Sequence, residues 1–173
     1  MPLIRNGSWA RDEYTALTDQ APLPDGGVLV SLTRLQADQE LLVARNLPLG
    51  VRLTSAQSPE EIGSCLHHLS LVALEFPTFR DGRGFSWARL LRSRLGFRGE
   101  IRAVGHFLID QLAFMERCGI NAFDGDARIT PEALAAARLE FSNVYQPAVD
   151  GRASIGHLRT QSLSPTKGTR YNP

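Results

Sequence analysis

Residues 69–97 have the sequence LSLVALEFPTFRDGRGFSWARLLRSRLGF, which predicts a strand, an irregular loop and a helix. The apolar run Leu71–Leu74 is short and bounded by polar residues, as in a strand buried on both faces of a parallel sheet. Pro77 should end the strand, because proline cannot donate to the sheet ladder. Ser86 is the expected N-cap of the helix, and Gly96 its expected C-terminal stop. The strand–loop–helix order indicates an α/β protein.

The loop between this strand and helix combines glycine with arginine. Glycine allows tight turns whose N–H groups point inward, and a helix start presents unpaired N–H donors. Arginine adds bidentate contacts to oxyanions. The loop therefore predicts a site for a phosphate, carboxylate or sulfur oxyanion, made of Arg80, Gly82, Arg83, Gly84 and Ser86. The alternative is a surface loop whose arginines pair with carboxylates such as Asp81.

The same order of elements repeats along the chain. The expected strands are residues 28–32, 49–54, 69–76, 100–105 and 120–123. Thr33, Ser58 and Thr130 mark expected helix starts. Strict alternation favours a parallel sheet with right-handed crossovers, and five units are too few for a closed barrel of eight. The predicted fold class is α/β, with a parallel sheet of five strand–helix units that is either half-barrel-like or open and doubly wound.

The chain divides into three parts. Residues 1–26 form an N-terminal segment, where Asn6-Gly7 suits the turn of a small hairpin. Residues 27–142 form the α/β domain. Residues 143–173 are rich in Gly, Pro, Ser, Thr and Arg without periodicity, which predicts a flexible C-terminal tail; an ordered arm that wraps a partner is the alternative.

Three of the expected strands carry a charge in an apolar context, at Arg52, Glu75 and Arg102. Buried charges are costly unless they are paired. If the strands neighbour each other in sequential order, as in a barrel, Glu75 lies between the two arginines. The pattern predicts either a polar site on the sheet or charges at strand ends that reach water.

His106 and Asp110 are four residues apart in a helix expected from about His106 to Cys118. That spacing places both on one helix face, near the sheet edge where α/β sites form. A His–Asp pair suits acid–base catalysis; the alternative is a first-turn aspartate that favours the helix dipole. The sequence has no metal-binding motif, no GxSxG, no Walker A loop and no GxGxxG. We therefore expect no metal site and no evident cofactor.

Composition limits the partners. The 173 residues have a formal net charge of +1, with 43% hydrophobic and 21% charged residues, which is ordinary for a globular protein. No apolar run approaches the roughly 18 residues that span a bilayer, and no signal-peptide core begins the chain. Cys65 and Cys118 indicate free thiols in a reducing compartment, with a redox role for Cys118 as the alternative. We expect a cytoplasmic protein that binds neither nucleic acid nor membrane.

Three blocks between Glu75 and Phe123 carry a family resemblance. They read FPTFRDGRGFSWARLLR from Phe76 to Arg92, GEIRAVG from Gly99 to Gly105, and DQLAFMERCG from Asp110 to Gly119. They closely resemble a bacterial family named domain of unknown function 934. The resemblance implies a role in sulfite reduction, because such proteins are usually described as probable oxidoreductases of that pathway. That description rests on being encoded beside sulfite or nitrite reductase and assigns no catalytic residue.

Two functional hypotheses follow. The first is an accessory protein of assimilatory sulfite reduction that binds the reductase or a small oxyanion, because the chain shows ligands for none of the haem, iron–sulfur or flavin cofactors that deliver electrons to sulfite. The second is an oxidoreductase that acts on a small anion at the Arg80–Arg83 loop, with His106 or Asp110 as the acid–base group. The expected partners are sulfite or nitrite reductase, a small oxyanion, and a second copy of the chain in a homo-oligomer.

Overall fold

The computed structural model describes residues 3–140 and 143–162. Within them the strands form one eight-stranded sheet in the order β2-β1-β8-β7-β6-β5-β4-β3. Its strands are β1 (Leu3–Arg5), β2 (Ser8–Ala10), β3 (Tyr14–Ala16), β4 (Gly27–Ser31), β5 (Leu49–Leu53), β6 (Leu71–Phe76), β7 (Glu100–Gly105) and β8 (Ala122–Asp124). All neighbours from β3 to β8 are parallel, whereas β1 is antiparallel to both β2 and β8.

The parallel ladder confirms the α/β class, and β4 to β8 match the five expected strands. The expected count was wrong, because β1, β2 and β3 join the same sheet. These strands have three residues each, too few for a clear alternation of apolar and polar side chains. The expected hairpin is β1–β2, and it turns at Asn6 (φ 52°) and Gly7 (φ 86°), as a type I′ turn requires.

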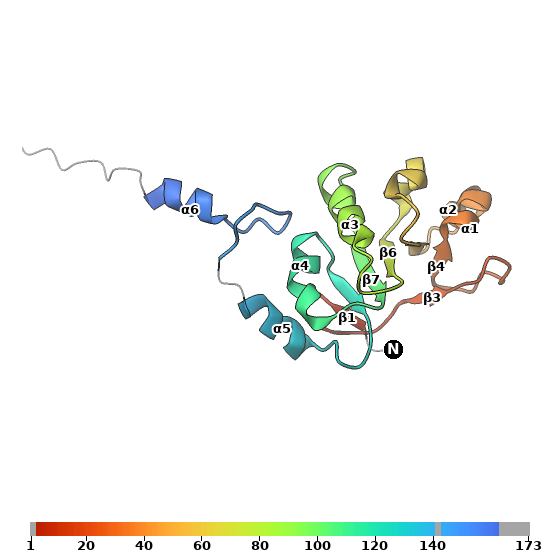
Figure 1. Ribbon diagram of the computed structural model, residues 1–173. Helices are drawn as coiled ribbons and strands as arrows, with labels where there is room; N and C mark the ends of the chain where they lie inside the picture. Colours follow the sequence, from red (N-terminus) through yellow and green to blue (C-terminus); the bar gives the residue numbers. More distant parts are fainter. Residues whose placement is uncertain (1–2, 141–142, 163–173) are drawn as a thin grey trace, which may run out of the picture.

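The strand order decides between the two predicted architectures. β4 to β8 follow one another in sequence, and all the helices that connect them pack on the same face. A doubly wound sheet needs helices on both faces, so the structure is the half-barrel-like alternative (Figure 1). The helices are α1 (Leu32–Ala37), α2 (Gln39–Ala44), the 3₁₀ helix η1 (Pro59–His68), α3 (Arg83–Ser93), the 3₁₀ turn η2 (Ile109–Gln111), α4 (Leu112–Arg117), α5 (Pro131–Glu140) and α6 (Ile155–Ser162).

A short link shows how strongly the sheet is curled. β2 and β3 are the two edges of the sheet, yet residues 11–13 suffice to join Ala10 to Tyr14. Four Cα-to-Cα steps span at most about 15 Å, whereas seven spacings in a flat sheet would separate the edges by about 34 Å. The sheet must therefore bend so that its edges approach. The link crosses the helix-free inner face, where Asp12 contacts Arg102.

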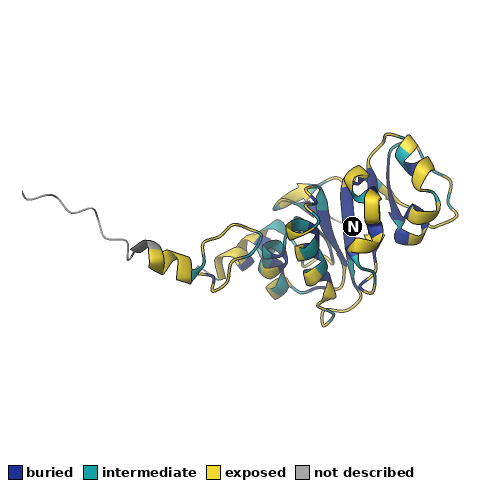
Figure 2. Ribbon diagram, turned by 90° about the horizontal axis from the view of Figure 1, so that it is seen from above, coloured by how far each residue is buried: buried dark blue, intermediate teal, exposed yellow. Residues whose placement is uncertain are grey.

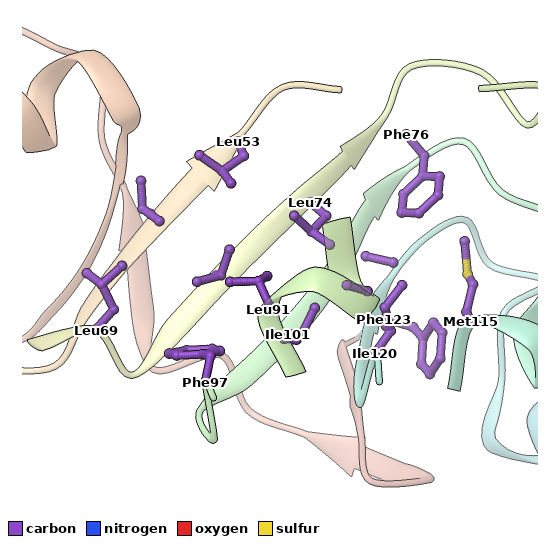
Figure 3. Close-up of a cluster of buried hydrophobic side chains, with 14 of the residues drawn as sticks. Leu53, Leu69, Leu74, Phe76, Leu91, Phe97, Ile101, Met115, Ile120 and Phe123 are labelled. Carbon is purple, nitrogen blue, oxygen red and sulfur yellow. The ribbon is translucent and has the colours of Figure 1, made fainter. Parts of the chain in front are cut away.

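The main core lies between the helices and the outer face of the sheet. Leu91 and Ala88 of α3 are fully buried there, together with Leu74, Ile101 and Phe123 of the strands (Figure 3). In Figure 2 the central strands of the sheet are mostly dark blue, while the helices expose yellow outer surfaces. Truncating a fully buried leucine such as Leu91 to Ala typically costs about 2–5 kcal/mol. This packing fixes α3, and with it the loop that precedes α3.

The inner face of the sheet has a smaller apolar cluster, made of Leu29, Leu71, Ala73 and Val104, against which Tyr14 packs. Between these apolar residues the same face carries the charges Arg52, Glu75, Glu100 and Arg102, because alternate residues of a strand share a face. The sheet thus has an apolar outer face for the helices and a mixed inner face under the link.

The helix starts agree only partly with the sequence. Ser58 caps η1 in a capping box with Glu61, and Thr130 accepts from the Ala133 N–H at the start of α5, both as expected. The first helix is capped by Ser31 instead of Thr33, so it begins at Leu32. Helix α3 begins at Arg83 with Gly82 as N-cap, so Ser86 lies inside its first turn and caps nothing. Gly96 has φ 66° and ends α3 as predicted.

Part of the expected C-terminal tail is described. Within residues 143–162 the chain crosses α4, where the Arg117 guanidinium donates to Asp150 (3.0 Å) and to the Gln146 carbonyl (2.7 Å), and α6 then lies away from the sheet (Figure 1). Residues 163–173 lie outside the described part, and flexibility of the tail stays a prediction. None of the helices in the described ranges is both long and apolar enough to cross a bilayer.

Candidate functional site

The carboxyl ends of β4 to β8 lie along one edge of the sheet, because these strands are parallel. Residues 77–82 leave this edge after β6, residues 106–108 after β7, and residues 125–130 after β8. Ligand sites of parallel α/β folds form at this edge, since loops from several strands converge there. The loop predicted to bind an oxyanion is therefore at the edge where the sequence placed it.

In that loop the donors of Arg83, which were expected to bind an oxyanion, form hydrogen bonds to the Asp81 carboxylate of the same chain. The Asp81 carboxylate accepts from Arg83 at Nη2 (2.6 Å), Nε (3.0 Å) and the backbone N–H (3.2 Å). The Arg83 guanidinium also donates to the Ser55 hydroxyl at 2.8 Å. The hydrogen bonds from Arg83, with a smaller contribution from Ser55, hold the pKa of the Asp81 carboxyl well below its usual range. A free oxyanion at Arg83 would have to displace Asp81.

The Asp81–Arg83 arrangement is a local turn that recurs in the chain. Arg128 donates its backbone N–H (2.9 Å) and its guanidinium (2.6 Å) to Asp126, and the Arg152 N–H donates to Asp150 at 3.2 Å. In each case an aspartate binds the backbone two residues ahead, as short polar side chains do in Asx turns. For Arg83 the structure therefore supports the alternative hypothesis, in which a surface arginine of the loop pairs with Asp81.

The glycines of the loop serve packing. Gly84 lies on the Phe76 ring, and a Cβ there would be 2.5 Å from that ring. Gly82 has φ −84° and room for a Cβ, whose closest neighbour would be the Phe85 ring at 3.8 Å. Neither glycine has the left-handed backbone that was the reason to expect inward-pointing N–H groups. Gly84 is needed so that α3 can start directly against the end of β6.

Arg80 is the arginine of the loop whose guanidinium is not paired with a carboxylate of the described residues. It is exposed, its guanidinium carbon lies 5.4 Å from the centre of the Phe79 ring, and it has no ion pair among the described residues. Phe79 is itself 45% exposed. The two predicted arginines thus differ: Arg83 is held by Asp81, and Arg80 is available to a partner.

His106 and Asp110 do not share a helix face. The helix expected from His106 begins at Ile109, because Gly105 (φ 104°) turns the chain and the His106 N–H donates to the Phe76 carbonyl (2.8 Å). His106 lines a pocket of about 360 Å³ beside Phe79 and the Asp126–Arg128 pair. Asp110 lines other hollows, against α4, α5 and residues 143–152. The spacing argument for a His–Asp pair was therefore wrong, although His106 does lie in a carboxyl-edge pocket.

The three charged strand residues form two separate groups. Nη2 of Arg52 lies 3.4 Å from Oε1 of Glu75, and the two side chains are 48% and 30% exposed. Arg102 is level with Ala73 in the strand register, and it contacts Asp12 and Glu100 instead of Glu75. The prediction that Glu75 lies between two arginines was therefore wrong for Arg102. It was right for Arg52, and the pair Arg52–Glu75 lies near the carboxyl edge.

Arg102 is the centre of a buried charge cluster on the inner face. Its side chain is 1% exposed and donates to Glu100 (2.7 Å) and to both oxygens of Asp12 (2.9 and 3.1 Å). Arg5 donates to the second oxygen of Glu100 at 2.6 Å. Burial lowers the pKa of Arg102, but Asp12 and Glu100 outweigh it and the net pKa is raised. This cluster attaches the N-terminal link to the sheet, and we interpret its role as stabilising the fold.

Sequence reasoning missed three acidic residues of these sites, which are Asp12, Glu100 and Asp126, and it also missed the buried Asp124. Glu100 was detectable, because it stands two residues before Arg102 and so shares its face. Asp124 ends β8, and its buried Oδ1 has no hydrogen-bond partner within the described part of the chain. Asp12 and Asp126 lie outside the strands that the sequence indicated, so no pattern pointed to them.

Neither the two cysteine thiols nor the side chains that could bind a metal ion form a further site in the part of the chain that the structure describes. Cys65 and Cys118 are free and buried, and burial raises the pKa of both thiols. A raised pKa keeps a thiol protonated and weakly nucleophilic at neutral pH. No group of three His, Cys, Asp or Glu side chains gathers in a way that could hold a metal ion in the ranges that the structure describes.

Fold and site together define a class: an α/β half-barrel protein with loops and small pockets at the carboxyl edge of a mostly parallel sheet. The profile of the family described as bacterial protein of unknown function (DUF934) matches residues 50–155. The match covers more than half of the chain, and the protein belongs to this family. It begins in β5 and includes the loop before α3 and the His106 pocket. No curated protein matches the chain.

Proposed function

We propose that the protein is an accessory component of assimilatory sulfite reduction that binds the reductase through the surface of α3. The pathway is the one that the family resemblance implies, and the description of the matched family states no function. The mode of action is supported by how charge is distributed around α3, which is the observation that carries the proposal.

Between Pro77 and Gly99 the chain has six arginines and one acidic residue, in a protein with a net charge of +1. Arg83 is held by Asp81, and Arg92 donates to the carbonyls of Phe97, Gly99 and Gly119. The other four are exposed and form no ion pair with any described residue: Arg80, Arg89, Arg94 and Arg98. We call these four the α3 basic surface. An unneutralised basic surface suits an acidic partner.

The size of this surface favours a macromolecule. Helix α3 has 11 residues and so is about 16 Å long. Arg80 precedes the helix and Arg98 follows it, so one small oxyanion cannot contact both. Exposed aromatic residues adjoin the surface: Phe79 neighbours Arg80, and Phe114, which is 57% exposed, contacts the Phe85 ring of α3 (5.2 Å). Arginine and aromatic side chains are the groups enriched at protein interfaces.

A pull-down tests the proposal. The full chain is immobilised and incubated with purified assimilatory sulfite reductase of the same bacterium. We expect the wild-type protein to retain the reductase and the double variant Arg89→Glu/Arg94→Glu to lose it. Arg11→Glu is the control for reversing an exposed arginine elsewhere, because Arg11 is exposed in the link on the inner side of the sheet. No retention by the wild type, or equal retention by the reversed variant, would rule out this surface.

An enzyme acting on a small anion is the second candidate. The observation that favours it is the pocket of about 360 Å³ at the ends of β6, β7 and β8, where His106 lies beside Arg128 and near the open Arg80 loop. Sulfite, sulfate and phosphate should be titrated by calorimetry into wild type, Arg80→Ala and His106→Asn. Binding weakened by these variants, or a visible chromophore in freshly purified protein, would favour the enzyme. A colourless protein that retains the reductase would favour the accessory role.

A further inference from the structure

The pair Arg52–Glu75 lies in a second pocket at the carboxyl edge. This pocket has a volume of about 290 Å³ and is built from the ends of β3, β4, β5 and β6. Leu17 and Leu29 give it an apolar side, while Ser31, Thr54, Gln57 and the charged pair give it a polar side. Convergence of four strand ends on one hollow is how α/β barrels form ligand sites. Its volume is at the lower end for ligand pockets, so it suits a small molecule.

The charged pair in this pocket is incompletely satisfied. Nη2 of Arg52 and Oε1 of Glu75 are 3.4 Å apart, which is long for a charge-assisted hydrogen bond. Most of the other ion pairs among the described residues are closer, with 2.6 Å for Arg83–Asp81 and 2.7 Å for Arg102–Glu100, and Arg34–Asp38 at 3.3 Å is the nearest to it in length. The guanidinium of Arg52 therefore keeps donors, and the carboxylate of Glu75 keeps lone pairs, that no described residue takes up.

Gln57 adds a neutral donor to the same wall. Its Oε1 accepts from the backbone N–H (2.9 Å) and the hydroxyl (3.1 Å) of Thr54, so the amide orientation is set by two bonds. Its NH₂ group has no acceptor among the residues that the structure describes. The pocket thus offers a cation and an amide donor on β5 and its following loop, and a carboxylate on the neighbouring strand β6.

These charges select the chemistry of the ligand. A simple oxyanion at Arg52 would lie beside the Glu75 carboxylate, and a simple cation at Glu75 would lie beside the Arg52 guanidinium. A molecule that carries both charges a few ångströms apart meets an opposite charge at each end. We propose that this pocket binds a small zwitterion of the α-amino acid type, with its carboxylate on Arg52 and Gln57 and its ammonium on Glu75. The site is separate from the α3 basic surface and does not rest on the proposed function.

The test uses the full chain and the twenty common L-amino acids, each titrated by calorimetry. The amino acid that binds best is then compared with its N-acetyl derivative, which lacks the ammonium, and with its decarboxylated amine. Each derivative should bind at least about tenfold more weakly, because each leaves one charged partner of the pocket unpaired. Binding of none of the twenty amino acids, or equal binding of the derivatives, would overturn the proposal.

Variants locate the site. Arg52→Gln and Glu75→Gln should each weaken binding of that amino acid by about ten- to a hundredfold, since each removes one charged hydrogen-bond partner. Arg128→Gln is the matched control at the same edge, because its arginine lines the other pocket. Thermal unfolding identifies a variant that does not fold, and the other Gln variant then decides. Wild-type affinity in both Gln variants would exclude this pocket.

Discussion

Replacing Asp12 by Asn removes the charged group that the N-terminal link gives to Arg102. The Arg102 side chain is 1% exposed, and Asp12 accepts from it at 2.9 and 3.1 Å. Breaking a buried ion pair typically costs about 3–5 kcal/mol. The cost here should be smaller, because Glu100 remains 2.7 Å from Arg102 and Asp12 is 41% exposed. We expect a loss of about 1.5–3 kcal/mol, the range for hydrogen bonds to charged groups.

Urea unfolding followed by circular dichroism measures this loss, and thermal unfolding should show a fall of about 2–4 °C for each kcal/mol. The matched control is Glu13→Gln, which also removes one negative charge from the link, at an exposed side chain next to Asp12. We expect this control to change the free energy of unfolding by less than about 0.5 kcal/mol. Equal effects of the two variants would show that the link does not hold the curled sheet through Arg102.

Two further predictions concern the loop before α3. Gly84→Ala should destabilise the protein by about 1–3 kcal/mol, because its Cβ would lie 2.5 Å from the buried Phe76 ring. Gly82→Ala should cost less than about 1 kcal/mol, because a Cβ has room there and only the N-cap preference for glycine is lost. Equal effects in urea unfolding would contradict the packing role of Gly84. Asp81 has a lowered pKa in the folded state, so its carboxylate stabilises the fold above about pH 4 and this contribution is lost as pH falls further. The difference in unfolding free energy between wild type and Asp81→Asn should therefore be constant near neutrality and shrink in acid, and a difference that grows in acid would contradict the sign.

The sequence predicted the fold well where apolar runs were long enough to be read. The apolar run Leu71–Leu74 and the similar runs in β4, β5 and β7 correctly predicted the parallel strands. Gly96 correctly predicted the end of α3. Tyr14–Ala16 has no comparable run, and its pairing with β4 depends on the curl of the whole sheet. The same curl brings Asp12 to Arg102, a contact between residues 90 positions apart that no local pattern encodes.

The candidate site was predictable in location more than in detail. The loop after Phe76 is at the carboxyl edge because a parallel strand must end there, and Arg52 does meet Glu75. The missed details have local causes. Asp81 reaches the backbone of Arg83 in an Asx turn, which starts α3 before Ser86, and Gly105 delays the following helix past His106. Arg52 and Arg102 are both level with Ala73, and only Arg52 meets Glu75, because Asp12 of the link and Glu100 take the Arg102 guanidinium.

The central claim, that α3 binds the reductase, is tested most directly by the dissociation constant of the complex. Biolayer interferometry should compare wild type, Arg89→Glu/Arg94→Glu and Arg11→Glu with purified assimilatory sulfite reductase, at salt from roughly 0.05 M to roughly 0.5 M. We expect charge reversal on α3 to raise the dissociation constant at least about tenfold, chiefly through slower association, and salt to weaken the wild-type complex. A dissociation constant that neither charge reversal nor salt changes, or the absence of a complex, would contradict the claim.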